Sequence, residues 1–147
     1  MKLSPNFSLR EFLQSQVATR LNIDMTPSQE IIEALTLLTI NVLQPAREVV
    51  GPISVSSGYR PLPLNKYIGG SENSQHCKGE AADLICEDNA HLFDIIKKHL
   101  PFDQLIWEFG NDQEPAWVHV SYNVNSNRGM ILRAIKQAGK TVYVPLS

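Results

Sequence analysis

Two histidines and one aspartate have the residue types and the setting of a metal site. His76 and Asp83 lie in the stretch NSQHCKGEAADLI, and His119 lies in the strand-like run WVHVSY. A carboxylate in an apolar strand loses its hydration, which is costly unless a cation or hydrogen bonds compensate. Two neutral imidazoles and one carboxylate are a common ligand set for catalytic zinc, with the fourth position open for water or substrate. The three residues therefore predict a zinc site, and the metal would compensate Asp83.

The remaining histidines and the cysteines have ordinary interpretations. His91 and His99 lie on an amphipathic segment, where a solvated helix face is expected. Cys77 and Cys86 lack CxxC spacing, so we expect free, partly buried thiols. A role for Cys77 as a zinc ligand stays open as an alternative, although neighbouring residues on an extended segment point in opposite directions.

The composition indicates one globular unit with a localised site. The chain has 147 residues, of which 43% are hydrophobic, so we expect a single domain over residues 1–147 and a monomer. The net charge of -2 provides no broad basic field, which argues against nucleic acid as a partner. No apolar stretch suits a secretory signal or a bilayer span, so we expect synthesis in the cytoplasm and no membrane association.

Helix signals dominate the N-terminal part of the chain. Ser8 and Glu11 form a capping-box pattern ahead of the segment REFLQSQVATRL, which we expect to be helical. Residues 26–29 mark a second helix start, with proline at the first helical position. Apolar residues then recur at helical spacing, and we expect this second helix to end at Pro45.

Strand signals dominate the rest of the chain. A segment rich in proline, glycine and serine at 61–74 indicates a loop with one helical turn, and residues 89–100 indicate an amphipathic helix capped by Asp88 or Asn89. Short turns join the last four strand-like runs in pairs, which predicts two hairpins. The strand-like runs are 53–57, 80–86, 103–109, 117–122, 129–135 and 141–146. The expected fold class is α+β, with N-terminal helices packed on a mostly antiparallel sheet.

A longer motif makes the metal site more specific. The pattern SxHxxGxAxD is met by Ser74, His76, Gly79, Ala81 and Asp83. The tetrapeptide SGYR precedes this motif, and a histidine flanked by tryptophan follows it. From about residue 53 to 122 the chain resembles the zinc D-Ala-D-Ala carboxypeptidase family, which includes bacterial dipeptidases, phage endolysins and wall-trimming DD-peptidases. The stretch NFSLREFLQS is also similar to the opening of small phage or prophage members.

The resemblance implies a role for each of these residues in a Hedgehog/DD-peptidase-like fold. His76, Asp83 and His119 would bind Zn²⁺. Arg60 of SGYR would stabilise charge on the scissile carbonyl oxygen, because a guanidinium aimed at a developing oxyanion lowers the barrier. Ser74 would hold the C-terminal end of the substrate.

The proton-accepting base is the point at which the chain departs from the family. Many members carry a carboxylate three residues before the second histidine, and this position is Ala116. We expect Glu108 to be the base if its strand pairs with WVHVSY so that 108 opposes 119, whereas a slip of one residue would turn Glu108 away. Glu114, in the connecting turn, is the alternative.

Two functions from different classes follow from the resemblance. The first is zinc-dependent hydrolysis of peptide bonds in peptidoglycan stem peptides, as a D-Ala-D-Ala carboxypeptidase or as an endolysin-like DD-endopeptidase. Such an enzyme would act on the cell wall, with phage-type release as one route to it. The second is a catalytically inactive, zinc-bearing module that binds cell-wall peptide or serves as a phage structural component. Ala116 keeps the second function open.

Overall fold

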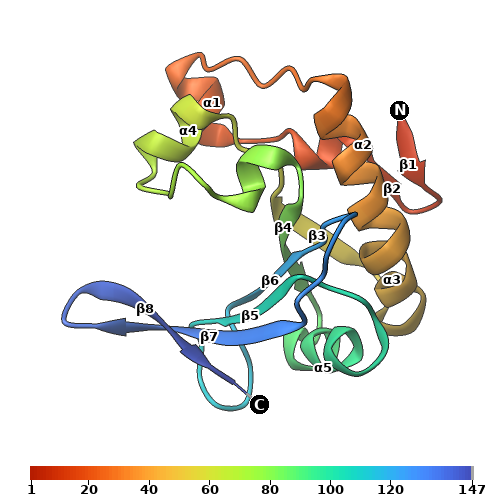
Figure 1. Cartoon of the computed structure of the whole chain (residues 1–147), viewed down its shortest axis with the longest axis vertical. Coiled ribbons are helices and arrows are strands. Elements are labelled where there is room, and N and C mark those ends of the chain that lie inside the picture. Colours follow the sequence, from red (N-terminus) through yellow and green to blue (C-terminus); the bar gives the residue numbers. More distant parts are fainter. Residues whose placement is uncertain (147) are drawn as a thin grey trace.

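A six-stranded sheet organises the part of the chain that the structure describes (Figure 1). The computed structural model describes residues 1–146. The strands are β3 (Ile53–Ser57), β4 (Ala81–Cys86), β5 (Gln104–Glu108), β6 (Trp117–Ser121), β7 (Met130–Gln137) and β8 (Lys140–Pro145). Their order across the sheet is β3-β4-β6-β5-β7-β8, and β5 and β7 run parallel while the other neighbouring pairs are antiparallel. A separate small sheet joins β1 (Lys2–Ser4) to β2 (Phe7–Ser8).

The helical segments α2, η2, α3 and α5 cover one face of this sheet and build the core with it. The helical segments are η1 (Leu9–Phe12), α1 (Gln16–Leu21), α2 (Gln29–Leu38), η2 (Thr39–Leu43), α3 (Gln44–Val50), α4 (Leu62–Tyr67), η3 (Gln75–Lys78) and α5 (Asn89–His99). Buried side chains from α2, η2, α3 and α5 form one cluster with those of β4, β5 and β6. This arrangement confirms the expected α+β class. Within residues 1–146, no helix combines the length and the apolar character needed to cross a membrane.

The first expected helix is divided into two pieces. The amide of Ser8 donates to the carboxylate of Glu11 at 2.7 Å, which confirms the capping box. This box begins only the short turn η1. The hydroxyl of Ser15 accepts from the amide of Ala18 at 3.1 Å and begins α1 as a second N-cap. The prediction of one helix over this segment was therefore wrong, because a serine inside it starts a new helix.

The second expected helix differs at both ends. Its N-cap is Ser28, whose hydroxyl accepts from the amide of Ile31, so the start lies just after the predicted one. Pro45 does not end the helix, which continues through η2 and α3 to Val50. In the π-turn η2, the amide of Gln44 donates five residues back to Thr39. This wider turn accommodates the missing amide hydrogen of the following proline, which an uninterrupted α-helix would need.

The two faces of the sheet serve different purposes. Val118 and Val120 are buried in the core, and Trp117 and His119 alternate with them on the opposite face. The segment from α4 to η3 borders this second face on one side, and the β7–β8 hairpin borders it on the other (Figure 1). The expected loop at 61–74 thus contains α4 and forms part of the border. The asymmetry places the candidate site on the side away from the helical core.

A glycine positions η3 against α2. Gly79 ends η3 with φ of +72°, a conformation that L-residues rarely adopt. A Cβ atom at this position would lie 2.8 Å from the carbonyl oxygen of Ile31, a backbone atom of α2. The motif residue Gly79 is therefore required by both backbone conformation and close packing, and it determines where His76 lies relative to β4.

We predict that Gly79→Ala destabilises the fold more than Gly139→Ala does. Both glycines have positive φ, but only the added Cβ at 79 meets backbone within 4 Å. The shared conformational strain is worth about 1–2 kcal/mol, and overpacking against Ile31 adds about 1–3 kcal/mol at position 79. Urea denaturation of both variants measures the difference in free energy of unfolding. Equal losses would contradict the proposed close contact with α2.

Candidate metal centre

Asp83 and His119 are directly opposed on neighbouring strands. The antiparallel pairing of β4 with β6 places Asp83 opposite His119, and such pairs have Cβ atoms about 5 Å apart. The Nδ1 atom of His119 lies 3.0 Å from Oδ1 of Asp83, with both side chains only 12–14% exposed. Two residues 36 positions apart therefore meet through strand register alone.

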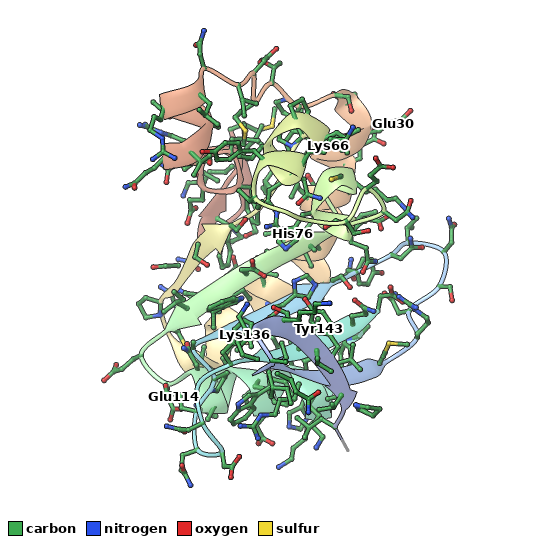
Figure 2. The ribbon with its side chains drawn as sticks, turned by 90° about the vertical axis from the view of Figure 1, so that its left-hand side faces the viewer. Glu30, Lys66, His76, Glu114, Lys136 and Tyr143 are labelled. Carbon is green, nitrogen blue, oxygen red and sulfur yellow. The ribbon has the colours of Figure 1, made fainter. Side chains whose placement is uncertain are left out.

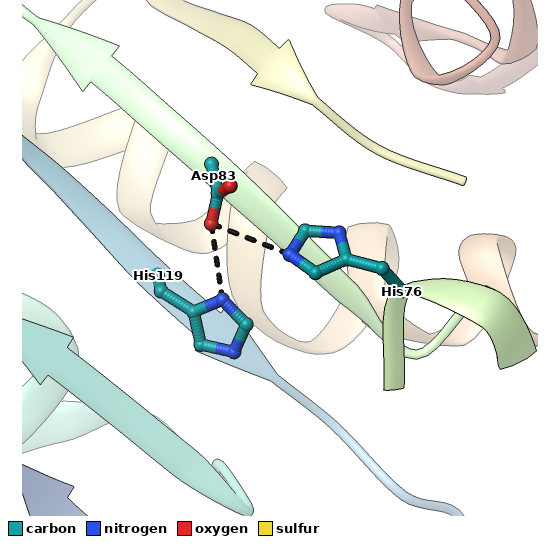
Figure 3. A group of neighbouring side chains, drawn as sticks. All are labelled: His76, Asp83 and His119. Atoms are coloured by element: carbon teal, nitrogen blue, oxygen red, sulfur yellow. Dashed lines mark hydrogen bonds and ion pairs between the residues drawn. The ribbon is translucent and has the colours of Figure 1, made fainter. Parts of the chain in front are cut away.

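His76 completes the group from outside the sheet. Its side chain is 2% exposed, and its Nε2 atom lies 3.4 Å from Oδ1 of Asp83 (Figure 3). The other ring nitrogen, Nδ1, lies 2.8 Å from the carbonyl oxygen of Gly58. A carbonyl only accepts, so Nδ1 donates the hydrogen and the lone pair of Nε2 is left free in the neutral ring. That buried Nε2 has no hydrogen-bond partner among the described residues.

The geometry and the protonation states of this group fit zinc. One ligand atom from each of the three residues lies within 4.8 Å of the others. Ligand atoms about 2.1 Å from a tetrahedral zinc would be about 3.4 Å apart, close to the two separations above. Burial lowers the pKa of His76, which favours the neutral imidazole. Burial alone would raise the pKa of Asp83, but the two histidines hold it well below its usual range, so the residues have the forms that bind metal.

The three residues open into a pocket of about 920 Å³ on the second face of the sheet. Its walls come from the segment that includes α4 and η3, from the central strands and from the β7–β8 hairpin. Figure 2 shows His76 on the side of the first wall and Tyr143 on the side of the hairpin. The metal group is therefore accessible to a ligand as well as preorganised by the sheet.

Arg60 and Ser74 both line this pocket, as the resemblance implies. The amide of Arg60 donates to the carbonyl oxygen of His76 at 3.0 Å, which ties the SGYR segment to η3. The side chain of Arg60 is half-buried, and its Nε atom has no partner among the described residues. The Ser74 hydroxyl accepts from the amide of His76 at 3.2 Å as the N-cap of η3, so its own hydrogen stays available to a ligand.

Glu108 faces the same pocket, although the expected register was wrong. β5 pairs with β6 so that Ile106 opposes His119 and Glu108 opposes Trp117. The difference from the expected pairing is two residues, and a shift of two leaves the side chain on the same face of the sheet. Glu108 is 6% exposed and lines the pocket together with the metal group.

The surroundings of Glu108 suit a group that exchanges protons near neutral pH. Burial raises the pKa of Glu108 to about 7, with His119 and Arg60 opposing this effect and Asp83 adding to it. A general base is most effective when its pKa lies near the operating pH. The backbone of Glu108 also lies beside position 116, where many family members carry the carboxylate base. The amide of Ala116 donates to the carbonyl oxygen of Glu108 at 2.9 Å.

Glu114 lies elsewhere. It is exposed, and its Oε1 atom accepts from the amide of Asn89 at 3.0 Å, at the start of α5. It is not among the residues that line the pocket, and Figure 2 shows it well separated from His76. Cys77 also lies outside the metal group, and it and Cys86 are free, half-buried thiols as expected.

The structure adds pocket residues that the sequence did not reveal. Tyr143 on β8 lines the pocket, and the carboxylate of Asp103 forms a two-pronged ion pair with Arg128 at 2.8–2.9 Å. Alternation within TVYVPL places Thr141 and Tyr143 on one face, but nothing local indicates that this face borders the metal group. Asp103 and Arg128 are 25 positions apart, and no pattern in the sequence indicates that they pair.

A buried His, Asp, His donor set in an open pocket, which a glutamate and an arginine also line, fits a catalytic zinc site. The chain belongs to the Peptidase M15 family, whose model matches residues 5–121. This membership confirms the expected class of zinc metallopeptidase.

The chain is also similar to a curated relative. A stretch of 53 residues is 43% identical to the zinc D-Ala-D-Ala carboxypeptidase of Streptomyces albus G. This stretch covers 35% of the chain and 21% of the relative, so the match spans about a fifth of the relative's length. The similarity supports zinc as the metal of the His76, Asp83 and His119 group.

We predict that zinc stabilises the protein through Asp83. Zinc at a thousandfold excess over Kd should raise the free energy of unfolding by about 4 kcal/mol, and a chelator should reverse the gain. Asp83→Asn should remove most of it, because a neutral amide is a poor substitute for a carboxylate ligand. Thermal unfolding with and without zinc measures the effect. The control is Asp94→Asn, which alters a surface pair with Lys98 and should keep the full response.

The raised pKa of Glu108 predicts a pH dependence of stability in chelator-treated protein. Folded Glu108 retains its proton up to about pH 7, while the unfolded chain releases it near 4.5. The folded state therefore binds more protons in this window, and the free energy of unfolding should fall as pH rises, on the order of 2 kcal/mol. Glu108→Gln should abolish this part of the slope. Identical slopes in urea denaturation of the two proteins between pH 4.5 and 7 would contradict the prediction.

Proposed function

We propose that the protein hydrolyses a peptide bond in peptidoglycan stem peptides, at a D-amino acid, with zinc held by His76, Asp83 and His119. The observation that carries the proposal is the convergence of these residues and Glu108 on one pocket. Membership in Peptidase M15 and the similarity to the zinc D-Ala-D-Ala carboxypeptidase of Streptomyces albus G support the substrate class.

Glu108 is the residue best placed to move protons in this reaction. Zinc, when bound, supplies a Lewis acid that polarises the carbonyl and makes water a stronger acid. The carboxylate of Glu108 accepts the proton of the attacking water and returns it to the nitrogen of the leaving amine. Its burial favours proton uptake, because a neutral carboxylic acid is easier to bury than a carboxylate.

Arg60 and Ser74 act on the substrate in this proposal. The guanidinium of Arg60 stabilises negative charge on the scissile carbonyl oxygen. Its position in the pocket supports this role, as does its Nε atom, which has no partner within residues 1–146. The hydroxyl of Ser74 donates to the C-terminal side of the substrate while its oxygen continues to cap η3. Both groups come from the same wall, which orients the peptide relative to the sheet.

The shape of the pocket favours a cut within a longer peptide. Its lining extends along the strands on both sides of the row that contains Asp83 and His119, with Gln104 at one side and Trp117 at the other. A substrate chain can therefore continue in both directions from the scissile bond. This feature favours the DD-endopeptidase, endolysin-like form of the proposal over removal of a terminal D-Ala.

A catalytically inactive, zinc-bearing module that binds cell-wall peptide is the second candidate. Ala116 favours it, because the usual family position lacks a carboxylate. Against it, Glu108 lies on the adjacent strand and its backbone bonds directly to that position. The two candidates differ in whether the wall is cut.

We predict that Glu108→Gln lowers kcat on purified peptidoglycan by about 100- to 10,000-fold, the usual contribution of a general base. Zinc content should be unchanged, because Glu108 is not in the metal group. Mass spectrometry of the released fragments identifies the bond, since cleaved cross-links indicate an endopeptidase and free D-Ala indicates a carboxypeptidase. Glu114→Gln is the matched control and should retain activity.

Two other outcomes would contradict this assignment of Glu108. Stoichiometric zinc in the parent without any released fragment would replace the peptidase with the binding module. Loss of activity in Glu114→Gln but not in Glu108→Gln would assign the base to the turn instead.

A further inference from the structure

The β7–β8 hairpin lines the pocket although it lies beyond the part of the chain that matches the family. The match ends at residue 121, and β7 and β8 occupy 130–145. Leu132, Thr141 and Tyr143 nevertheless line the same pocket as the metal group. The chemistry and this wall of the pocket thus come from different parts of the chain.

Strand register brings Tyr143 toward Glu108. Glu108 pairs with Ala134 on β7, and Ala134 pairs with Tyr143 on β8. Paired residues point to the same face of a sheet, and neighbouring strands lie about 4.8 Å apart. Ala134, which lies between them, has a small side chain and is 0% exposed. The longer side chains of Glu108 and Tyr143 can therefore extend over it. Tyr143 and Glu108 therefore belong to one row across the pocket floor.

The hydroxyl of Tyr143 is available as a donor. Within residues 1–146 the structure shows no hydrogen-bond partner for it, and the side chain is 52% exposed. Burial of part of the ring and the charge of Glu108 raise the pKa of Tyr143 above its ordinary value. The hydroxyl consequently keeps its hydrogen at neutral pH. It faces the pocket from the wall opposite to the one that carries Arg60.

The hairpin is held firmly enough to act as a wall. Five residues of β5 pair with β7, from Gln104 to Glu108. The ammonium of Lys136 on β7 lies 5.5 Å from the ring centre of Phe109, which packs on Trp117 at 5.4 Å. These contacts connect the hairpin to β5, which carries Glu108, and through Phe109 to β6. Binding groups are most effective on such rigid elements.

We propose that Tyr143 is a substrate-binding residue whose hydroxyl donates a hydrogen bond to a backbone carbonyl of the bound peptide, on the Glu108 side of the metal group. The β7–β8 hairpin then forms the second wall of the substrate groove, opposite Arg60. The inference rests on the proposed function for the identity of the peptide, and on register and burial for the position of the residue.

A binding experiment without turnover tests this role. The zinc-loaded Glu108→Gln protein is titrated calorimetrically with a soluble, cross-linked stem-peptide dimer, with and without the additional change Tyr143→Phe. Loss of one neutral hydrogen bond should weaken Kd by about tenfold. Tyr67→Phe is the matched control, because Tyr67 is similarly exposed at 59% and is not among the pocket residues. This change should leave Kd unaltered.

A kinetic readout separates binding from chemistry. In protein that retains Glu108, Tyr143→Phe should raise KM about tenfold with kcat changed less than twofold, and zinc content and Tm should stay the same. An unchanged Kd in Tyr143→Phe, or no binding of the dimer to either protein, would overturn the inference. If the parent fails to cleave the dimer while Kd still depends on Tyr143, the proposed function fails and the inference stands.

Discussion

One carboxylate oxygen, Oδ1 of Asp83, lies within 3.4 Å of both imidazoles, and the arrangement of the surrounding elements depends on it. A carboxylate that is only 14% exposed is costly unless positive charge or donors surround it. The two histidines, one on β6 and one on η3, surround the carboxylate from different sides. β6 must pair with β4 in the register that opposes His119 to Asp83, and η3 must end at Gly79 so that His76 reaches the same oxygen. The carbonyl of Gly58 then holds the outer nitrogen of His76 and aims the inner one at the site.

The same strands that carry the site also build the core, so stability and function are coupled through the sheet. On β6, Val118 and Val120 pack against the helices while His119 points the other way. A close-packed core deforms little, and the ligand atoms inherit this rigidity. Burial also determines protonation, since it keeps His76 neutral and raises the pKa of Glu108 to about 7. Burial disfavours the charged form of both groups, so it leaves His76 as a neutral metal ligand and makes Glu108 a better proton acceptor.

The carboxylate proposed as the base lies on a different strand from the usual family position. The family position at 116 lacks a carboxylate, yet its amide bonds to the backbone of Glu108 on the neighbouring strand. In the proposed mechanism the proton-accepting base therefore comes from β5. In many other family members it comes from the segment just before the second histidine. The wall formed by β7 and β8 lies outside the matched region, so the groove combines a metal group from the matched region with a border from beyond it.

Local patterns in the sequence determined a large part of this protein. Alternation in WVHVSY predicted the faces of Val118 and His119, and Asp88 was one of two predicted caps of α5. The SxHxxGxAxD spacing indicated two members of the metal group, His76 and Asp83. These features depend on residues within a few positions of one another. The register of β5 against β6, the passage of the helix through Pro45 and the place of Tyr143 depended on the tertiary structure. They arise from contacts between segments far apart in the chain, or from a π-turn that the local spacing does not encode. Shifting a strand by two residues keeps every side chain on its face, so the sequence could place Glu108 on the correct face while only the folded sheet decided which residue lies opposite it.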